Sequence, residues 1–128
     1  MAGLKEKMVE RRVDELVPYE RNQKKHDDKQ VRNIANSLKR FGQKQPIVID
    51  KKDVVVIGHG RLLAAKMLGW ETVDCVVADD LSEDEIRELR IVDNKTNESP
   101  WDFELLGEDI KGIDFSGFDF DFDGAEMA

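Results

Sequence analysis

Residues 54–69 read Val-Val-Val-Ile-Gly-His-Gly-Arg-Leu-Leu-Ala-Ala-Lys-Met-Leu-Gly. The β-branched run predicts a strand that ends before Gly58, and the run from Arg61 to Leu68 predicts a helix that ends at Gly69. The first turn of a helix has unpaired N–H groups and the positive end of the helix dipole, so it attracts anions. The stretch therefore predicts a phosphate site made by Gly58, His59, Gly60 and Arg61.

An ordinary strand-to-helix turn has the same pattern, so both interpretations remain open at this point. The turn lacks the third glycine of a dinucleotide-binding fingerprint and the Gly-Lys-Ser/Thr of a P-loop. What favours the phosphate site is Arg61, because a guanidinium can add two parallel, charge-assisted hydrogen bonds to a phosphate.

The sequence before this turn predicts a helix and a hairpin. Apolar residues recur at helical spacing between Val31 and Phe41, with Asp27 or Asp28 as the N-cap and Gly42 after the last turn. Two short β-branched strands, 45–49 and 54–57, are separated by a polar connector of hairpin length. A short edge strand is expected over residues 12–17, before Pro18.

The sequence after the turn predicts a further strand and helix. Residues 72–78 are apolar almost throughout, which is typical of an internal strand. Ser82 and Glu85 have the spacing of a capping box and open a helix to about Asn97, and residues 101–106 predict one more helical turn. The order β-α-β-β-α-β-α predicts an α+β fold with a small mixed sheet and flanking helices.

The length of 128 residues is typical of one domain. We expect a flexible leader over 1–11, the folded domain over 12–106 and an acidic tail or linker over 107–128. In that tail Phe alternates with Asp between 113 and 124. Such a run can form an edge strand, but its charge favours a mobile segment or one that orders on a partner.

The charges of the chain are segregated. Residues 1–70 hold 16 Lys and Arg against 9 Asp and Glu, a balance of +7, whereas residues 71–128 hold 4 against 19, a balance of −15, which gives the net charge of −8. The basic half can offer phosphates a positive face, although a solvated helix surface has the same composition.

Cys75 is the single cysteine and lies in an apolar run, so a buried, unreactive thiol is expected. A chain without a possible internal disulfide fits the reducing cytoplasm of a bacterial or phage-infected cell. The sequence has no export signal at residues 1–8 and no apolar stretch of about 20 residues, so no membrane association is expected.

The ordered signals resemble the ParB/sulfiredoxin superfamily, in particular its ParB-like N-terminal domain. The similar segments are Leu-Val-Pro-Tyr-Glu-Arg-Asn at 16–22, Gly-Gln-Lys-Gln-Pro-Ile-Val at 42–48 and Ile-Gly-His-Gly-Arg-Leu-Leu-Ala-Ala at 57–65. Together with residues 76–98, they look most like the phage or mobile-element type, which is often found upstream of a DNA methyltransferase domain. The chain itself has no Asp/Asn-Pro-Pro-Tyr and no Phe-x-Gly-x-Gly. We therefore expect a stand-alone form or a domain of a longer protein.

The resemblance implies a site for a nucleoside triphosphate, CTP or ATP, with Mg²⁺. By similarity, Gln43, Gln45 and Pro46 line the side of the base or ribose, and Gly58 to Arg61 hold the phosphates. Asp93 and Asn94 align with the third family motif and are then the oxygen ligands of Mg²⁺, which takes few protein ligands and keeps several waters. The alternative for this pair is a polar helix end in which Asn94 or Asn97 acts as a cap.

The chain departs from its relatives at the second motif. It has His59-Gly60-Arg61 where partition proteins have Glu-Arg-Arg, so one arginine is missing. His59 also replaces the reactive cysteine of sulfiredoxins, which excludes sulfinic-acid reduction because the thiolate is the nucleophile of that reaction.

Three functions follow from the sequence. The first is a nucleotide-binding, DNA-associated domain that contacts DNA through its basic N-terminal half and can form a homodimer. The second is an enzyme, either a metal-dependent nuclease or a small-molecule phosphotransferase, for which no catalytic residue is identified. The third is a non-catalytic interaction domain in which the motifs are structural. The fold alone does not choose among them, because related folds support unrelated chemistries.

Overall fold

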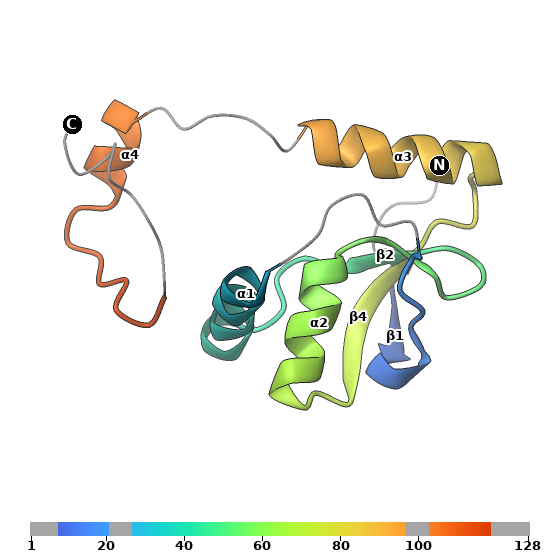
Figure 1. Ribbon diagram of the computed structural model, residues 1–128, viewed down its shortest axis with the longest axis horizontal. Coiled ribbons are helices and arrows are strands. Elements are labelled where there is room, and N and C mark those ends of the chain that lie inside the picture. The colour runs from blue at the N-terminus through green and yellow to red at the C-terminus, as the bar shows by residue number, and fades with distance from the viewer. Residues whose placement is uncertain (1–7, 21–26, 97–102, 119–128) are drawn as a thin grey trace.

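A mixed four-stranded sheet forms the centre of the protein (Figure 1). The structure, a computed structural model, describes residues 8–20, 27–96 and 103–118. The strands are β1 (Met8–Arg12), β2 (Ile47–Ile49), β3 (Val55–Ile57) and β4 (Thr72–Val77). They lie in the order β1-β4-β2-β3. The predicted α+β fold with a small mixed sheet and flanking helices is confirmed.

The pairing of the strands follows from their connections. β2 and β3 form the predicted antiparallel hairpin, since only a short connector joins them. β4 runs parallel to β2 and antiparallel to β1, and it is therefore internal, as its apolar sequence predicts. Val17 extends the sheet beyond β3: its N–H donates to Asp53 O and its carbonyl accepts from Val55 N, both at 2.9 Å. This contact places the following residues, up to Glu20, near the end of β3.

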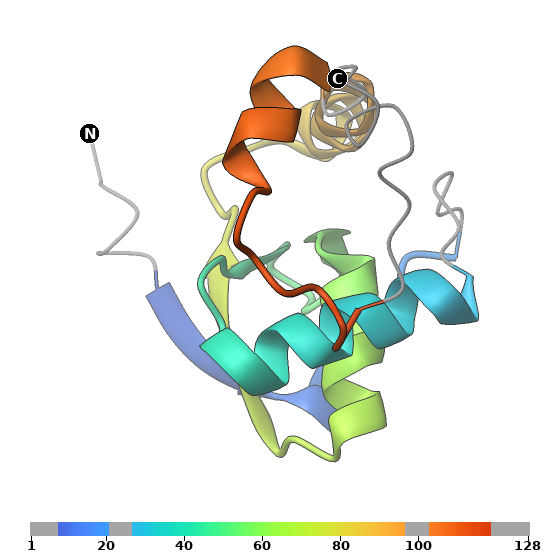
Figure 2. The same ribbon diagram turned by 90° about the vertical axis from the view of Figure 1, so that its left-hand side faces the viewer.

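In the described parts of the chain, α-helices and one 3-10 turn accompany the sheet. They are α1 (Asp28–Phe41), α2 (His59–Leu68), α3 (Glu83–Thr96), α4 (Phe103–Asp109) and η2 (Val13–Glu15). Figures 1 and 2 show α1 and α2 packed together on one side, α3 across one end of the sheet, and α4 beyond α3.

The predicted helix caps are present. The Asp27 carboxylate accepts from Gln30 N at 2.7 Å, and the residue after α1 is Gly42, with φ 79°. At the start of α3, Glu85 N donates to Ser82 Oγ at 3.2 Å, and Ser82 N donates to Glu85 Oε1 at 2.9 Å. The capping box is therefore complete and satisfies N–H groups that the helix itself leaves unpaired.

Apolar side chains of both sheet faces are buried. On one face, Ile47, Ile49, Val55 and Cys75 are fully buried and pack against Leu62 of α2. A second cluster joins α1 to α2, and a third joins β3 to α3 through Val56, Ala78 and Ile86. The hairpin and α2 are thus fixed against each other by the core, which gives the turn between them a defined position.

Several element boundaries differ from the sequence prediction; β2, for example, begins at Ile47 rather than at residue 45. The first strand is Met8–Arg12 rather than 12–17, because Val13 begins a 3-10 turn and Leu16 caps it, with both side chains buried in the core. Residues 8–11 of the expected leader thus belong to a strand. α2 begins at His59 rather than Arg61, and residues 103–109 form a helix longer than the predicted single turn.

The acidic tail is described only in part. Residues 113–118 contain no strand, and Asn36 of α1 donates a 2.8 Å hydrogen bond to Gly117 O. The remainder of the alternating Phe and Asp run lies outside the described residues. Among the helices of the described parts of the chain, none is long and apolar enough to span a membrane.

Candidate functional site

A pocket of about 1160 Å³ opens where the hairpin, α1, α2 and α3 meet. Its floor is formed by residues of β2 and β3 and by the turn into α2, and its walls by one side of α1, the segment 42–46 and the inner side of α3. Eight of the nine site residues predicted from the sequence line this pocket, namely Gln45, Pro46, Gly58, His59, Gly60, Arg61, Asp93 and Asn94.

The first turn of α2 faces this pocket. Gly58 is the N-cap, with φ 106°, a conformation that favours glycine. The first intrahelical bond of this turn runs from Leu62 N to Gly58 O, so the N–H groups before Leu62 lie at the open end of the helix. This end has the positive part of the helix dipole and suits an anion.

Arg61 lies over the turn. Its Nη1 would be 3.4 Å from a Cβ placed on Gly58, so the missing side chain at position 58 leaves room for the guanidinium. Arg61 Nη2 donates a hydrogen bond to Gln45 Oε1. Burial lowers the pKa of Arg61, and the negative charge of Asp93 partly offsets this effect. The guanidinium remains charged and is held beside the first turn of α2.

The two glutamines of the segment 42–46 have different positions. Gln45 lines the pocket and its side-chain oxygen accepts a hydrogen bond from Arg61, so it lies beside the first turn of α2. Gln43 does not line the pocket. Its amide group donates to Asp74 O and accepts from Asp74 N, both at 2.8 Å, and so extends the β2–β4 ladder by one residue.

Asp93 and Asn94 are near the end of α3 and line the pocket. One carboxylate and one amide oxygen fit the needs of Mg²⁺, a hard ion that completes its shell with phosphate oxygens and water. Within the described ranges, no group of three or more His, Cys, Asp and Glu side chains is placed to hold a metal ion by itself. The donor set thus fits a metal that arrives with a nucleotide.

Tyr19 and Arg90 are pocket residues that the sequence did not reveal. The Arg90 guanidinium lies 3.6 Å from the centroid of the Tyr19 ring, and its Nη2 donates to Val55 O at 3.3 Å. The backbone N–H of Tyr19 donates to His59 Nε2 at 3.2 Å. Tyr19 is therefore in contact both with α3 and with the first residue of α2.

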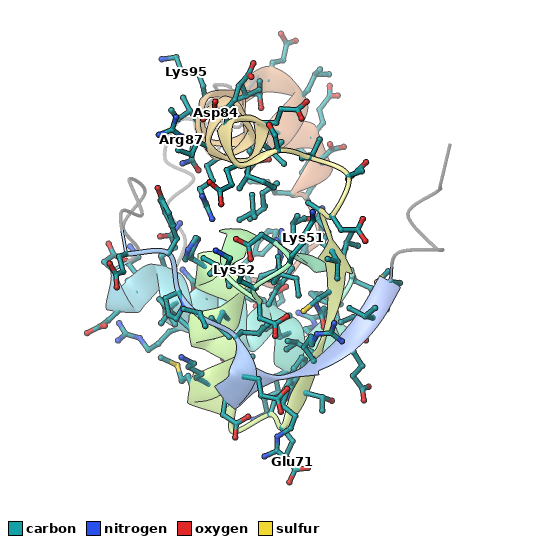
Figure 3. All side chains as sticks on the ribbon, turned by 90° about the vertical axis from the view of Figure 1, so that its right-hand side faces the viewer. Lys51, Lys52, Glu71, Asp84, Arg87 and Lys95 are labelled. Carbon is teal, nitrogen blue, oxygen red and sulfur yellow. The ribbon has the colours of Figure 1, made fainter. Side chains whose placement is uncertain are left out.

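Two more cations line the pocket, Lys44 and Arg87. Arg87 forms an exposed ion pair with Asp84, at 2.8 Å between Nη2 and Oδ1. Figure 3 shows this pair on α3, at the end of the molecule opposite Glu71. Helical periodicity identifies the inner side of α3 through Ile86 and Leu89. It does not show that Arg87 and Arg90 reach a pocket formed with α2.

Fold and site together thus define a small α+β domain in which the N-terminus of a helix opens into a pocket lined in part by charged side chains. The sequence profile of the ParB N-terminal domain matches residues 3–95. The chain belongs to this family, and its fold is similar to those of ParB N-terminal domains and sulfiredoxin.

Two relatives show the extent of the sequence similarity. The ParB-like nuclease domain-containing protein YnaK of Escherichia coli is 38% identical over 79 residues, which cover 62% of this chain and 91% of YnaK. The probable chromosome-partitioning protein ParB of Campylobacter jejuni is 33% identical over 91 residues, which cover 68% of this chain but 32% of that protein. The chain therefore spans about a third of the partition protein.

Solved structures agree on the fold. The C-terminally truncated ParB of Caulobacter crescentus, complexed with CTP-gamma-S, has a TM-score of 0.71 at 20% identity, over 81% of this chain and 61% of that one. The same protein complexed to the centromeric parS site gives a TM-score of 0.58, over 80% and 56% of the two chains. Sulfiredoxin from Arabidopsis thaliana has a TM-score of 0.54 at 20% identity, over 64% of this chain and 94% of that one.

Proposed function

We propose that this domain binds a nucleoside triphosphate together with Mg²⁺, and that it associates with DNA. The observation that supports nucleotide binding best is the first turn of α2, which opens into the pocket beside the half-buried Arg61. Lys44, Arg87 and Arg90 add positive charge to the same pocket. A triphosphate has the negative charge that this arrangement attracts.

Different pocket residues would contact different parts of the proposed ligand. Backbone N–H groups of the α2 turn and the guanidinium of Arg61 hold phosphate oxygens, and Gln45 keeps that guanidinium in place. Pro46 and the apolar part of the pocket receive the base or ribose. Asp93 and Asn94 hold Mg²⁺, which would neutralise phosphate charge. CTP is the first nucleotide to test, because a ParB of the same fold has been solved with a CTP analogue.

Titration with each of the four nucleoside triphosphates, with and without Mg²⁺, tests the proposal. We expect one of them to shift the backbone amide NMR signals of Gly58 to Arg61. Saturation at about one hundred times the dissociation constant would stabilise the fold by about 2.7 kcal/mol in a thermal-shift experiment. If none of the four shifts these signals, the motifs are structural and the interaction-domain alternative is supported.

Arg61→Ala gives the corresponding test by mutation. Removing a charge-assisted contact to phosphate is expected to weaken nucleotide binding by about 1.5 to 3 kcal/mol, measured by calorimetry. Arg12→Ala is the matched control, since Arg12 is an exposed arginine paired with Asp14 and does not line this pocket. Equal affinities for Arg61→Ala and wild type would argue against the proposed phosphate site.

A nuclease is the second candidate, because the similar protein YnaK is named for a nuclease domain. Metal-dependent cleavage of DNA requires carboxylates that converge on the metal ions. Incubation of plasmid DNA with the protein and Mg²⁺ or Mn²⁺ tests this alternative. Cleavage that is lost in Asp93→Asn would favour the nuclease, and intact plasmid would count against it.

A further inference from the structure

Two contacts connect α3 to the first turn of α2 through Tyr19, a residue outside both helices, and a third joins α3 to β3. Arg90 of α3 stacks on the ring of Tyr19, with 3.6 Å between the guanidinium carbon and the ring centroid. Arg90 is also hydrogen-bonded to Val55 O of β3. Tyr19 N donates to His59 Nε2, and His59 is the first residue of α2.

The hydrogen bond from Tyr19 to His59 also fixes the tautomer and the orientation of the His59 imidazole. Because Nε2 accepts a hydrogen bond from Tyr19, the neutral imidazole has its proton on Nδ1. The ring therefore has one tautomer and one orientation while the contact persists. The turn His59-Gly60-Arg61 has one arginine fewer than the Glu-Arg-Arg of partition proteins, so the orientation of the His59 side chain affects the surface that a phosphate would meet.

If packing were the only role of position 90 on α3, an arginine would be an unfavourable residue there. The guanidinium is partly buried, its Nε has no hydrogen-bond partner among the described residues, and burial lowers the pKa of Arg90. An apolar side chain could fill the same space on α3 without the cost of desolvating a charge. A cation over an aromatic ring does supply a directional contact that an apolar side chain lacks.

We propose that Arg90 and Tyr19 are positioning residues of the phosphate site. Their stacked pair holds the backbone N–H of Tyr19 on His59 and thereby keeps the first turn of α2 in the geometry that receives the ligand. The predicted effect of these two residues on nucleotide affinity rests on the proposed function. The contact between Tyr19 and His59 can be measured without any nucleotide.

The binding experiment uses Arg90→Ala, Tyr19→Ala and the double variant. Each single variant is expected to weaken binding of the Mg²⁺ nucleotide by about 5-fold or more, and the double variant by little more than either one, because both changes break the same stack. Tyr19→Phe keeps the ring and is expected to bind more tightly than Tyr19→Ala. Arg40→Ala is the matched control: Arg40 lies 5.0 Å from the Phe41 ring centroid, and neither residue lines the pocket.

The second measurement follows the His59 imidazole nitrogens and the Tyr19 amide by NMR in the free protein. Arg90→Ala is expected to shift both signals, and Arg40→Ala neither. If Arg90→Ala lowers the melting temperature but changes neither the His59 signals nor the affinity, Arg90 has a structural role and the inference is wrong. If wild type binds no nucleotide, the proposed function is wrong, and the NMR shifts alone decide whether Arg90 positions His59.

Discussion

Position 58 requires a glycine for two reasons, its positive φ and the close approach of neighbouring atoms. Its φ of 106° strains any residue with a Cβ, and that Cβ would lie 3.2 Å from Ile47 Cγ1 and 3.4 Å from Arg61 Nη1. Gly58→Ala is therefore expected to destabilise the fold by about 2 to 4 kcal/mol, from backbone strain and overpacking together. Urea denaturation measures this change.

Gly69→Ala is the control for the strain alone. Gly69 also has a positive φ, 73°, but an added Cβ would meet nothing within 4 Å. Gly69→Ala is expected to lower the unfolding free energy by about 1 kcal/mol. Equal costs at the two positions would show that Ile47 and Arg61 yield to the added methyl group, and that the close approach at Gly58 does not fix the guanidinium.

Cys75 predicts a pH dependence of stability. Its side chain is fully buried in the sheet, and burial raises the pKa of the thiol from 9.0 to about 11. Between these two values the unfolded chain loses its proton while the folded protein retains it, so stability falls as the pH rises from 9 toward 11. The difference in unfolding free energy between wild type and Cys75→Ala, measured at pH 8, 9.5 and 10.5, isolates this effect. A difference that is constant with pH would contradict it.

At the scale of elements, Gln43 acts as a side-chain extension of β2. Its amide makes two 2.8 Å hydrogen bonds with the backbone of Asp74 in β4, where β2 itself has not yet begun. Gln43→Ala is expected to lower the unfolding free energy by about 1 to 2 kcal/mol, because two net hydrogen bonds are lost. Its effect on nucleotide affinity is expected to be smaller than that of Gln45→Ala, since Gln45 lines the pocket and bonds Arg61. The opposite order would place Gln43 in the binding site.

The elements show which features local sequence determines. α1, the hairpin, α2 and the capping box of α3 were predicted from periodicity and end signals, which act over a few residues. β1 was misplaced because Met8–Arg12 has little apolar pattern of its own. It forms a strand by pairing with β4, more than 60 residues later in the chain. Arg90 and Tyr19 were missed for the same reason, since their contact exists only once α3 crosses the end of the sheet.

At the scale of the whole molecule, the site residues share one corner although they lie far apart in the sequence. The hairpin and α2 are fixed by the common core, so Gly58 and Arg61 keep the place that their local pattern predicts. The pocket itself also needs α3, which packs on β3 through Ile86. The turn from β3 into α2 could therefore be predicted from local residues, while the pocket walls depend on long-range packing.

The segregated charge of the whole chain gives a test of the proposed association with DNA. Arg32 and Lys39 are exposed and lie two turns apart on α1, in the basic half of the chain. If α1 contacts DNA, Arg32→Glu with Lys39→Glu lowers DNA affinity and reduces the slope of log affinity against log salt by about 2, because each lost phosphate contact lowers it by about 0.9. Fluorescence anisotropy with a labelled duplex at several salt concentrations measures both quantities.

The matched control is Lys51→Glu with Lys52→Glu, in the exposed hairpin connector that Figure 3 labels. Both double variants add −4 to the net charge of −8 and so have the same net charge of −12. A long-range effect of net charge alone would weaken DNA binding equally in both variants. A greater loss in the α1 variant assigns the contact to α1, because local phosphate contacts depend on where the charges lie. A greater loss in the connector variant would instead place DNA beside β2 and β3.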